Sequence, residues 1–199
     1  MQFIDAHAHL TSTETDVEPL LQRAHDAGLW GIINVSTHKD DLLRSIALSS
    51  TTPRIYTVAA VTPHDADKDD SEFFAEIEKN LPSLIAIGEI GLDYYYKMVS
   101  KDAQIKTFKR YLMLAKRANL PVVIHCREAF SDLYQTIEEI CPDIKVMLHC
   151  FTGTLEEAKL AQEKGWYISL SGIVTFKKSV ELQEVAKAID QEQMHVYPL

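Results

Sequence analysis

Residues 121–149, PVVIHCREAFSDLYQTIEEICPDIKVMLH, contain two short apolar runs on either side of an amphipathic segment. The runs Pro121–Ile124 and Lys145–Leu148 are largely apolar, as strands covered on both faces are. The segment Phe130–Ile140 between them has the periodicity of a helix. A strand, a helix and a second strand in this order predict a parallel βα unit.

The same alternation extends along the whole chain of 199 residues. The other expected strands are Gln2–Asp5, Trp30–Val35, Ile55–Val61, Leu84–Ile87 and Trp166–Leu170. The other expected helices are Val17–Ala27, Asp40–Ser50, Ser71–Asn80, Lys101–Ala118, Leu155–Glu163 and Ser179–Ile189. Met194–Val196 resembles the start of a further strand. The pattern predicts an α/β fold, a TIM-like (β/α) barrel of seven βα units plus a partial eighth strand.

Helix boundaries and domain organisation follow from local signals. Thr154 and Glu157 have the spacing of a capping box, and Gly28 and Gly165 stand where left-handed residues end helices. No linker rich in Pro, Gly or Ser divides the chain, so we expect residues 1–199 to form a single domain. A complete barrel of this kind has about 250 residues. We therefore expect one that lacks the usual C-terminal end.

The composition argues against several classes of protein. With 46% hydrophobic and 25% charged residues, the chain is globular and not disordered. We expect no membrane segment and no secretory signal, and three cysteines without a Cys-x-x-Cys pair predict a reduced, cytoplasmic protein. The net charge of −9 argues against DNA binding by a basic patch alone. Bound divalent ions reverse the local field, so nucleic acid stays open as a substrate.

Polar side chains mark the ends of several expected strands. His7 and His9 follow the first strand on one face, and His125 and His149 each follow an apolar run. Glu89 comes just after a fourth run. One histidine at a strand end is more often a hydrogen-bonded core residue than a ligand, but the C-terminal ends of barrel strands all meet on one face. Four imidazoles and a carboxylate there predict a site for one or two divalent ions, which Glu89 is able to bridge.

Five segments in order along the chain share their pattern with one known family. They are FIDAHAHL at 3–10, IGEIGLDYY at 87–95, VIHCREA at 123–129, LHCFTG at 148–153 and SLSGIVTFK at 169–177. These segments resemble the TatD family of metal-dependent deoxyribonucleases. The resemblance implies a TIM-like barrel, a divalent-metal site and phosphodiester hydrolysis, often as a 3′→5′ exonuclease, with single-stranded DNA as the expected substrate.

The resemblance also implies roles for the candidate residues. His7 and His9 would hold one metal ion, His125 and His149 a second, and Glu89 would bridge both as the catalytic carboxylate. Imidazole and carboxylate ligands suit Zn²⁺ and Mn²⁺, while family members are usually assayed with Mg²⁺ or Mn²⁺. We therefore expect two divalent ions and leave Mg, Mn and Zn open.

Two further side chains are candidates for substrate binding. Arg127 lies two residues beyond His125, where it would contact a phosphate or form a salt bridge at the start of a helix. The family usually carries a His-Pro pair after the third strand, and here Thr62 stands in place of that histidine. His64, after the proline, is the second candidate.

A second departure concerns the family's Glu-Thr-Asp at the eighth strand, which has no counterpart beside Met194–Val196. Losing a general base typically costs 10²–10⁴-fold in rate, so we expect reduced activity. Two alternatives stay open. In the first, the chain is a catalytically inactive barrel that binds metal, nucleotide or a protein. In the second, it is a metal-dependent hydrolase of amides or esters.

Overall fold

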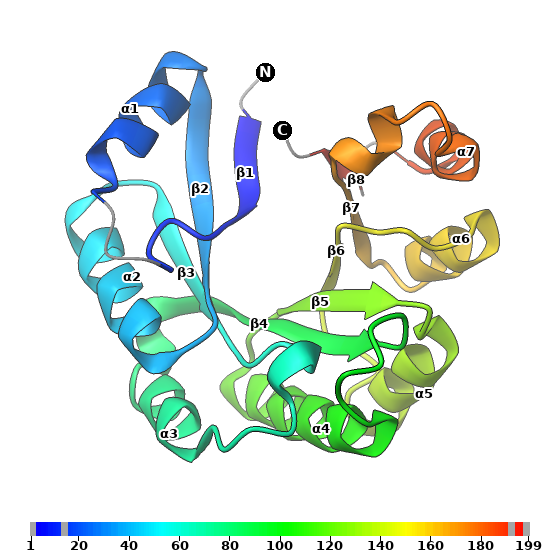
Figure 1. Cartoon of the computed structure of the whole chain (residues 1–199), viewed down its shortest axis with the longest axis horizontal. Helices are drawn as coiled ribbons and strands as arrows, with labels where there is room; N and C mark the ends of the chain where they lie inside the picture. Colours follow the sequence, from blue (N-terminus) through cyan, green and yellow to red (C-terminus); the bar gives the residue numbers. More distant parts are fainter. Residues whose placement is uncertain (1–2, 13–15, 191–193, 197–199) are drawn as a thin grey trace.

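The computed structural model describes residues 3–12, 16–190 and 194–196. It contains one parallel sheet whose strands follow the chain order from β1 to β8. The strands are β1 Phe3–Ala8, β2 Leu29–Ser36, β3 Ile55–Ala59, β4 Leu84–Asp93, β5 Val122–Arg127, β6 Val146–His149, β7 Tyr167–Leu170 and β8 Met194–Val196. The sheet curls as a barrel wall does, and the helices lie on its outer side (Figure 1). This confirms the predicted TIM-like arrangement.

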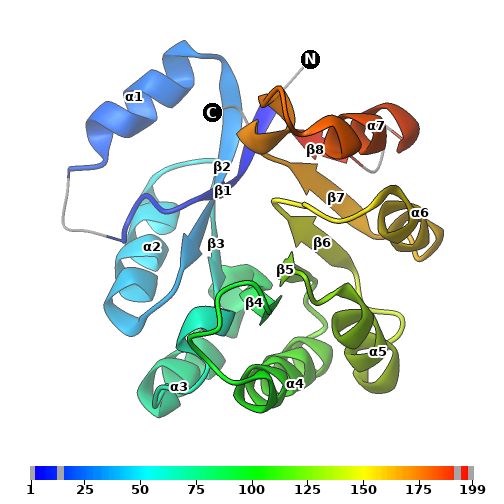
Figure 2. The same ribbon diagram turned by 45° about the vertical axis from the view of Figure 1, so that its right-hand side comes forward.

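A helix follows each of the first seven strands (Figure 2). The α-helices are α1 Glu18–Asp26, α2 Lys39–Thr51, α3 Ser71–Lys79, α4 Lys101–Ala118, α5 Phe130–Ile140, α6 Leu155–Glu163 and α7 Val180–Ala188. Three short 3₁₀ helices are η1 Pro63–Asp65, η2 Leu81–Ser83 and η3 Gly172–Thr175. None of the helices in the described part of the chain combines the length and apolarity needed to cross a bilayer.

The expected helix ends are present. Thr154 Oγ1 accepts from the backbone of Glu157 while the Glu157 carboxylate accepts from the backbone of Thr154, which completes the capping box. Gly28 and Gly165 have φ angles of 79° and 71°, in the left-handed region that glycine adopts most easily.

Apolar side chains pack on both faces of the sheet. The larger cluster fills the space between strands and helices and includes Ile87, Ile90 and Leu92 of β4. A smaller cluster, built from Val35, Val58, Ala86 and Val123, closes the inside of the barrel. Burial on both faces explains why the strands are continuously apolar in sequence.

Strand β4 departs from prediction. The expected strand stops at Ile87, whereas β4 continues to Asp93 and places Glu89 in its interior. Its register with β5 shifts between Ile87 and Ile90. Beyond this irregularity Ile90 and Leu92 pack outward, so Glu89 and Asp93 face the inside of the barrel.

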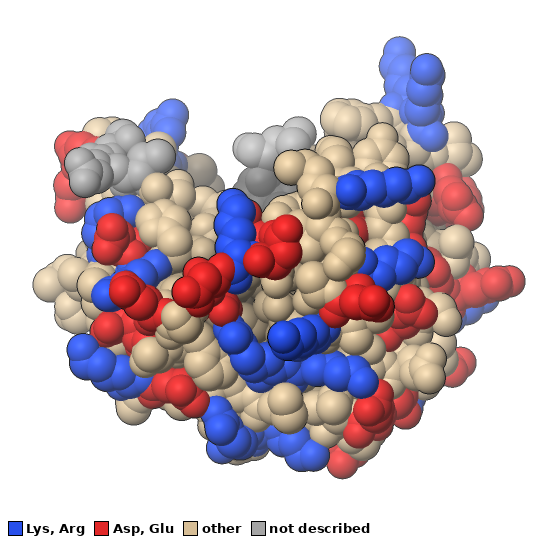
Figure 3. All heavy atoms as spheres, turned by 60° about the horizontal axis from the view of Figure 1, so that its bottom comes forward, with Lys and Arg blue, Asp and Glu red and all other residues tan. Residues whose placement is uncertain are grey.

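On the face of the molecule shown in Figure 3, Lys and Arg side chains alternate with Asp and Glu side chains. Ion pairs between neighbouring helices include Lys109 of α4 with Glu139 of α5 at 2.8 Å and Arg117 of α4 with Glu78 of α3 at 2.6 Å. This face therefore shows no concentrated positive field of the kind that holds nucleic acid electrostatically.

Candidate metal centre

Strand β1 and the residue that follows it bring two imidazoles, His7 and His9, to the inside of the barrel. The Nε2 atoms of His7 and His9 are 3.3 Å apart, and His7 Nε2 is 3.4 Å from Glu89 Oε2 on β4. The three residues offer ligand atoms that all lie within 4.8 Å of one another. The structure thus brings together the three groups that the sequence assigned to the first metal ion.

The hydrogen bonding of His9 fixes which of its nitrogens carries the proton. His9 Nδ1 is 2.9 Å from the backbone carbonyl oxygen of Val35, and a carbonyl oxygen only accepts. The proton of the neutral ring is therefore on Nδ1, which leaves a lone pair on Nε2 directed at His7 and Glu89. A backbone carbonyl that holds one imidazole nitrogen so that the other can coordinate is typical of metal sites.

A buried polar network secures the backbone beyond His9. Asn34 Oδ1 accepts from the backbone of Leu10 at 2.6 Å, and its amide donates to Thr11 Oγ1 at 2.6 Å and Ser45 Oγ at 2.8 Å. Thr11 Oγ1 in turn donates to Asp41 Oδ1 at 2.6 Å. Because these groups are buried and satisfied, the network fixes where β1 ends against β2 and α2.

Glu89 is the carboxylate at the centre of the cluster, and only 7% of its surface is exposed. Its Oε1 accepts from His125 Nδ1 at 2.9 Å, and its other oxygen faces His7. Burial opposes ionisation of this carboxyl, but hydrogen bonds from His125 and His7 outweigh burial and hold its pKa well below the usual range. Glu89 is therefore an anion able to bridge two cationic groups.

His149 completes the set from β6. Its ring stacks on that of His7 with centroids 3.5 Å apart, and the strand register places it beside His125. Burial, together with the neighbouring imidazole of His7, lowers the pKa of His149 to about 3. The ring is therefore neutral at physiological pH, which is the form that binds a metal ion.

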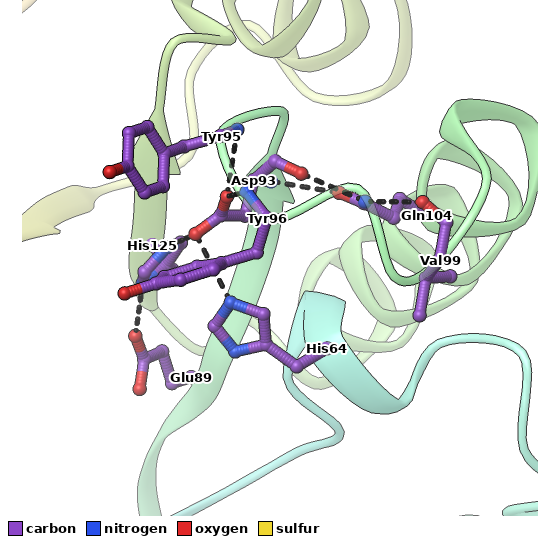
Figure 4. A network of polar contacts seen from close by, with 8 residues as sticks. All are labelled: His64, Glu89, Asp93, Tyr95, Tyr96, Val99, Gln104 and His125. Atoms are coloured by element: carbon purple, nitrogen blue, oxygen red, sulfur yellow. Dashed lines mark hydrogen bonds and ion pairs between the residues drawn. The ribbon is translucent and has the colours of Figure 1, made fainter.

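His125 belongs to a second group of ligand atoms. Its Nε2 lies 2.8 Å from Asp93 Oδ2, and His64 Nε2 lies 3.1 Å from the same oxygen (Figure 4). The ligand atoms of these three residues also lie within 4.8 Å of one another. Both nitrogens of His125 face carboxylates, which outweigh the effect of burial and raise its pKa. The second group therefore joins His125 to His64 and Asp93, while His149 stacks on the first.

Asp93 is not among the site residues predicted from the sequence, although it is fully buried and holds several parts of the site together. Its Oδ1 accepts from the backbone of Tyr95 at 3.0 Å and Tyr96 at 2.9 Å (Figure 4). The side chain of Gln104 on α4 bonds the Asp93 backbone in both directions, at 2.8 and 2.9 Å. The spacing of Asp93 from Glu89 carries a signal, because positions 89, 91 and 93 share one face of a strand.

Gly91 lies between the two carboxylates and permits the close approach of β4 to β5. Its φ is 140°, and a methyl group at this position would overlap the carbonyl oxygen of His125. Only glycine combines this backbone conformation with this contact.

The two predicted substrate-binding residues lie at the same edge of the barrel. His64 reaches Asp93 from η1, where Thr62 is the residue before the helix. The guanidinium of Arg127 lies 3.7 Å above the centre of the Tyr95 ring. Arg127 forms no salt bridge with any of the described residues. The expected alternative, a salt bridge at the start of a helix, is therefore not observed.

The donor set fits divalent metal ions. Imidazole nitrogens and a buried carboxylate converge, the tautomer of His9 is fixed for coordination, and His149 is held neutral.

Comparison with known proteins agrees with this arrangement. The sequence profile of a family described as TatD related DNase matches residues 4–196. The uncharacterized metal-dependent hydrolase YabD of Bacillus subtilis is 32% identical over 196 residues, which cover 96% of this chain and 76% of YabD. A protein named 3′-5′ ssDNA/RNA exonuclease TatD from Erwinia tasmaniensis is 30% identical, with coverages of 96% and 76%. The crystal structure of a TatD family hydrolase from Entamoeba histolytica superposes with a TM-score of 0.86 at 32% identity, covering 98% of this chain and 73% of that one.

Proposed function

Because the chain belongs to the TatD family of metal-dependent hydrolases, we propose that it is a 3′→5′ exonuclease of single-stranded nucleic acid. The observation that carries this proposal is the convergence of His7, His9 and Glu89 with His125 at the carboxyl edge of the barrel. The name of the Erwinia relative, an ssDNA/RNA exonuclease, supports the choice of substrate.

The residues present would hold two ions. His7, His9 and Glu89 would hold the first. His125 would hold the second, together with His149, its neighbour on β6, or with His64 and Asp93, whose ligand atoms lie within 4.8 Å of those of His125. When bound, such ions lower the pKa of a water molecule and neutralise charge on the phosphoryl oxygens. We propose Zn²⁺ or Mn²⁺ in preference to Mg²⁺ because most of these ligands are imidazoles.

The remaining residues of the site position the imidazoles or contact the phosphate groups of the substrate. Asp93 holds His125 and His64 at fixed places through one oxygen atom. Arg127 and His64 are the groups able to contact the phosphate, since both lie at the edge of the cluster next to the Tyr95–Tyr96 segment. With a net charge of −9 on the whole chain, attraction of an anionic strand depends on the charge of Arg127 and on the metal ions.

The test is metal-dependent cleavage of a single-stranded oligonucleotide labelled at its 5′ end. Wild type is treated with EDTA, reloaded with Mn²⁺, Zn²⁺ or Mg²⁺, and assayed beside Glu89→Gln. We expect products that shorten from the 3′ end and a loss of at least about 100-fold in Glu89→Gln. Glu139→Gln is the matched control, because it removes an exposed carboxylate of α5 and should keep full activity.

Bound metal without cleavage in the wild type would contradict the proposal and favour the inactive binding barrel. Hydrolysis of amide or ester substrates with an intact oligonucleotide would favour the other alternative. The reduced rate expected from the missing strand-eight aspartate stays a prediction, and the rate measured for the wild type tests it.

A further inference from the structure

Two tyrosines stand exposed beside the metal centre, and the proposed function gives them no role. We propose that Tyr95 and Tyr96 form a stacking subsite for one nucleobase of the single-stranded substrate, next to the phosphodiester that is cleaved. This inference rests on the proposed function and adds the means by which the strand is held.

The exposure of the two rings is the first observation. Tyr95 is 50% exposed and Tyr96 is 47% exposed, although both follow a strand whose residues from Ala86 to Asp93 are buried. Their ring centroids are 5.0 Å apart at an interplanar angle of 88°. This edge-to-face pair holds the two rings in a defined orientation and leaves aromatic surface open to solvent.

A cation lies on the same pair. The guanidinium carbon of Arg127 is 3.7 Å from the ring centre of Tyr95 and 5.0 Å from that of Tyr96. No carboxylate among the described residues pairs with Arg127, so its charge is available to a ligand. Aromatic rings together with an arginine form the surface on which proteins stack the bases of single strands while contacting the backbone phosphates.

The aromatic pair is coupled to the metal centre through Asp93. One oxygen of Asp93 accepts from the backbone of Tyr95 and Tyr96, and the other accepts from His125 and His64 (Figure 4). The His64 ring also meets the Tyr96 ring edge-on at 5.6 Å. A single buried carboxylate therefore sets the distance between the rings and the imidazoles.

This placement predicts how the substrate is recognised. Every base has an aromatic face, so stacking tolerates any sequence but requires that a base be present. We expect the affinity for a strand to depend on one base near the cleaved bond and to fall when that base is replaced by an abasic residue.

The experiment measures binding of fluorescent oligonucleotides by anisotropy, with phosphorothioate linkages that resist cleavage. One series carries a single abasic residue at each of the last four positions from the 3′ end. The proteins are wild type, the double variant Tyr95→Ala/Tyr96→Ala and the double variant Tyr95→Phe/Tyr96→Phe. Tyr167→Ala removes an exposed tyrosine at the N-terminal end of β7 and is the matched control.

We expect the double alanine variant to bind the intact oligonucleotide about 5- to 100-fold more weakly. It should bind the oligonucleotide with the critical abasic residue as wild type does, whereas the phenylalanine variant and Tyr167→Ala should keep the preference for the intact strand. Circular dichroism confirms that the variants are folded.

The outcomes separate this inference from the proposed function. If wild type binds and cleaves oligonucleotides but no abasic position weakens binding, the stacking subsite is wrong and the exonuclease proposal stands. The subsite is also wrong if the alanine variant loses equal affinity for intact and abasic strands. A wild type that neither binds nor cleaves overturns both.

Discussion

The substitution Asp93→Asn tests whether one buried carboxylate organises the site. Asp93 is fully buried and accepts four hydrogen bonds. Its Oδ1 accepts from the backbone of Tyr95 and Tyr96 at 3.0 and 2.9 Å. Its Oδ2 accepts from His125 Nε2 at 2.8 Å and from His64 Nε2 at 3.1 Å. Asparagine has nearly the same shape, but one of its two terminal atoms only donates.

The size of the effect follows from these contacts. The amide oxygen of asparagine can still accept from the two backbone N–H groups, while its NH₂ group faces the N–H of His125. The lost bond to a charged partner is worth about 1.5–3 kcal/mol, and the weaker bonds to the two amides add about 1 kcal/mol. We expect the free energy of unfolding to fall by about 3 kcal/mol. At a urea m-value of about 2–3 kcal/mol/M, the midpoint falls by about 1–1.5 M.

The assay is urea unfolding of metal-free protein in EDTA, followed by circular dichroism at several pH values. Burial raises the pKa of Asp93, but hydrogen bonds from Tyr96, His125 and His64 outweigh it and leave the pKa below its usual value. Stability from this carboxylate is therefore present above about pH 3.9 and is lost as the pH falls further.

The imidazole sets the upper limit of the pH window. Burial lowers the pKa of His125, but Glu89 and Asp93 outweigh it and raise the pKa. The stability that His125 contributes is complete below about pH 6.5 and is lost as the pH rises through the folded-state pKa. The difference in the free energy of unfolding between wild type and Asp93→Asn should thus be largest between about pH 4 and 6.5 and shrink on either side.

Glu139→Gln is the control for loss of a carboxylate charge. Glu139 is exposed and pairs with Lys109 at 2.8 Å, so its replacement should change stability by less than about 1 kcal/mol. Coincident unfolding curves for wild type and Asp93→Asn would refute the reasoning. A large difference that stays constant between pH 4 and 9 would also refute it, because the effect would then not involve the charged pair.

Three other predictions concern single residues. Gly91→Ala should lower the free energy of unfolding by at least about 2 kcal/mol in a urea titration, because its φ is 140° and the methyl group would overlap the carbonyl oxygen of His125. An unchanged midpoint would contradict this. Asn34→Asp removes two hydrogen bonds that the amide donates to buried hydroxyl groups, and it should lower the free energy of unfolding by about 2–4 kcal/mol in the same assay. A variant as stable as wild type would contradict the role given to this network. Burial raises the pKa of Cys126 to about 12, so iodoacetamide at pH 8 should alkylate it at least about 100-fold more slowly in the folded protein than in urea, as followed by mass spectrometry. Equal rates would show that the thiol is not shielded.

The helices were the most predictable part of the fold. The expected ranges Lys101–Ala118, Phe130–Ile140 and Leu155–Glu163 are the observed α4, α5 and α6. Their signals are local, since each helix has an apolar stripe, and Ser100 and Thr154 cap the starts of α4 and α6. Information confined to a few neighbouring residues is readable from one sequence.

The end of β4 was not predictable in the same way. Beyond Ile87 the sequence alternates glycine and acidic residues with apolar ones, which does not look like a strand covered on both faces. Glu89 and Asp93 are stable in the barrel interior only because His7 and His125 arrive there from other strands. The local pattern shows that Glu89 and Asp93 share a face of a strand, but it does not show these tertiary partners.

Much of the candidate metal centre followed from the rule that strand ends meet. His7, His9 and Glu89 do form one group, and His125 and His149 lie beside it. The rule predicts which residues are neighbours, but it does not predict which of their atoms form hydrogen bonds. It could not show that His9 keeps its proton toward a carbonyl group, nor that His125 is held between two carboxylates.

The irregularity in β4 connects the fold to the site. In a regular strand Glu89 and Asp93 would share a face with Ile87, which packs in the outer apolar core, and Ile90 and Leu92 would turn inward. Two carboxylates would then be buried without partners, at a cost of several kcal/mol each. The observed register shift between Ile87 and Ile90 avoids this cost, because it directs the apolar residues outward and the acids toward the imidazoles. The two acids that meet the imidazoles therefore also select the strand geometry that builds the candidate site.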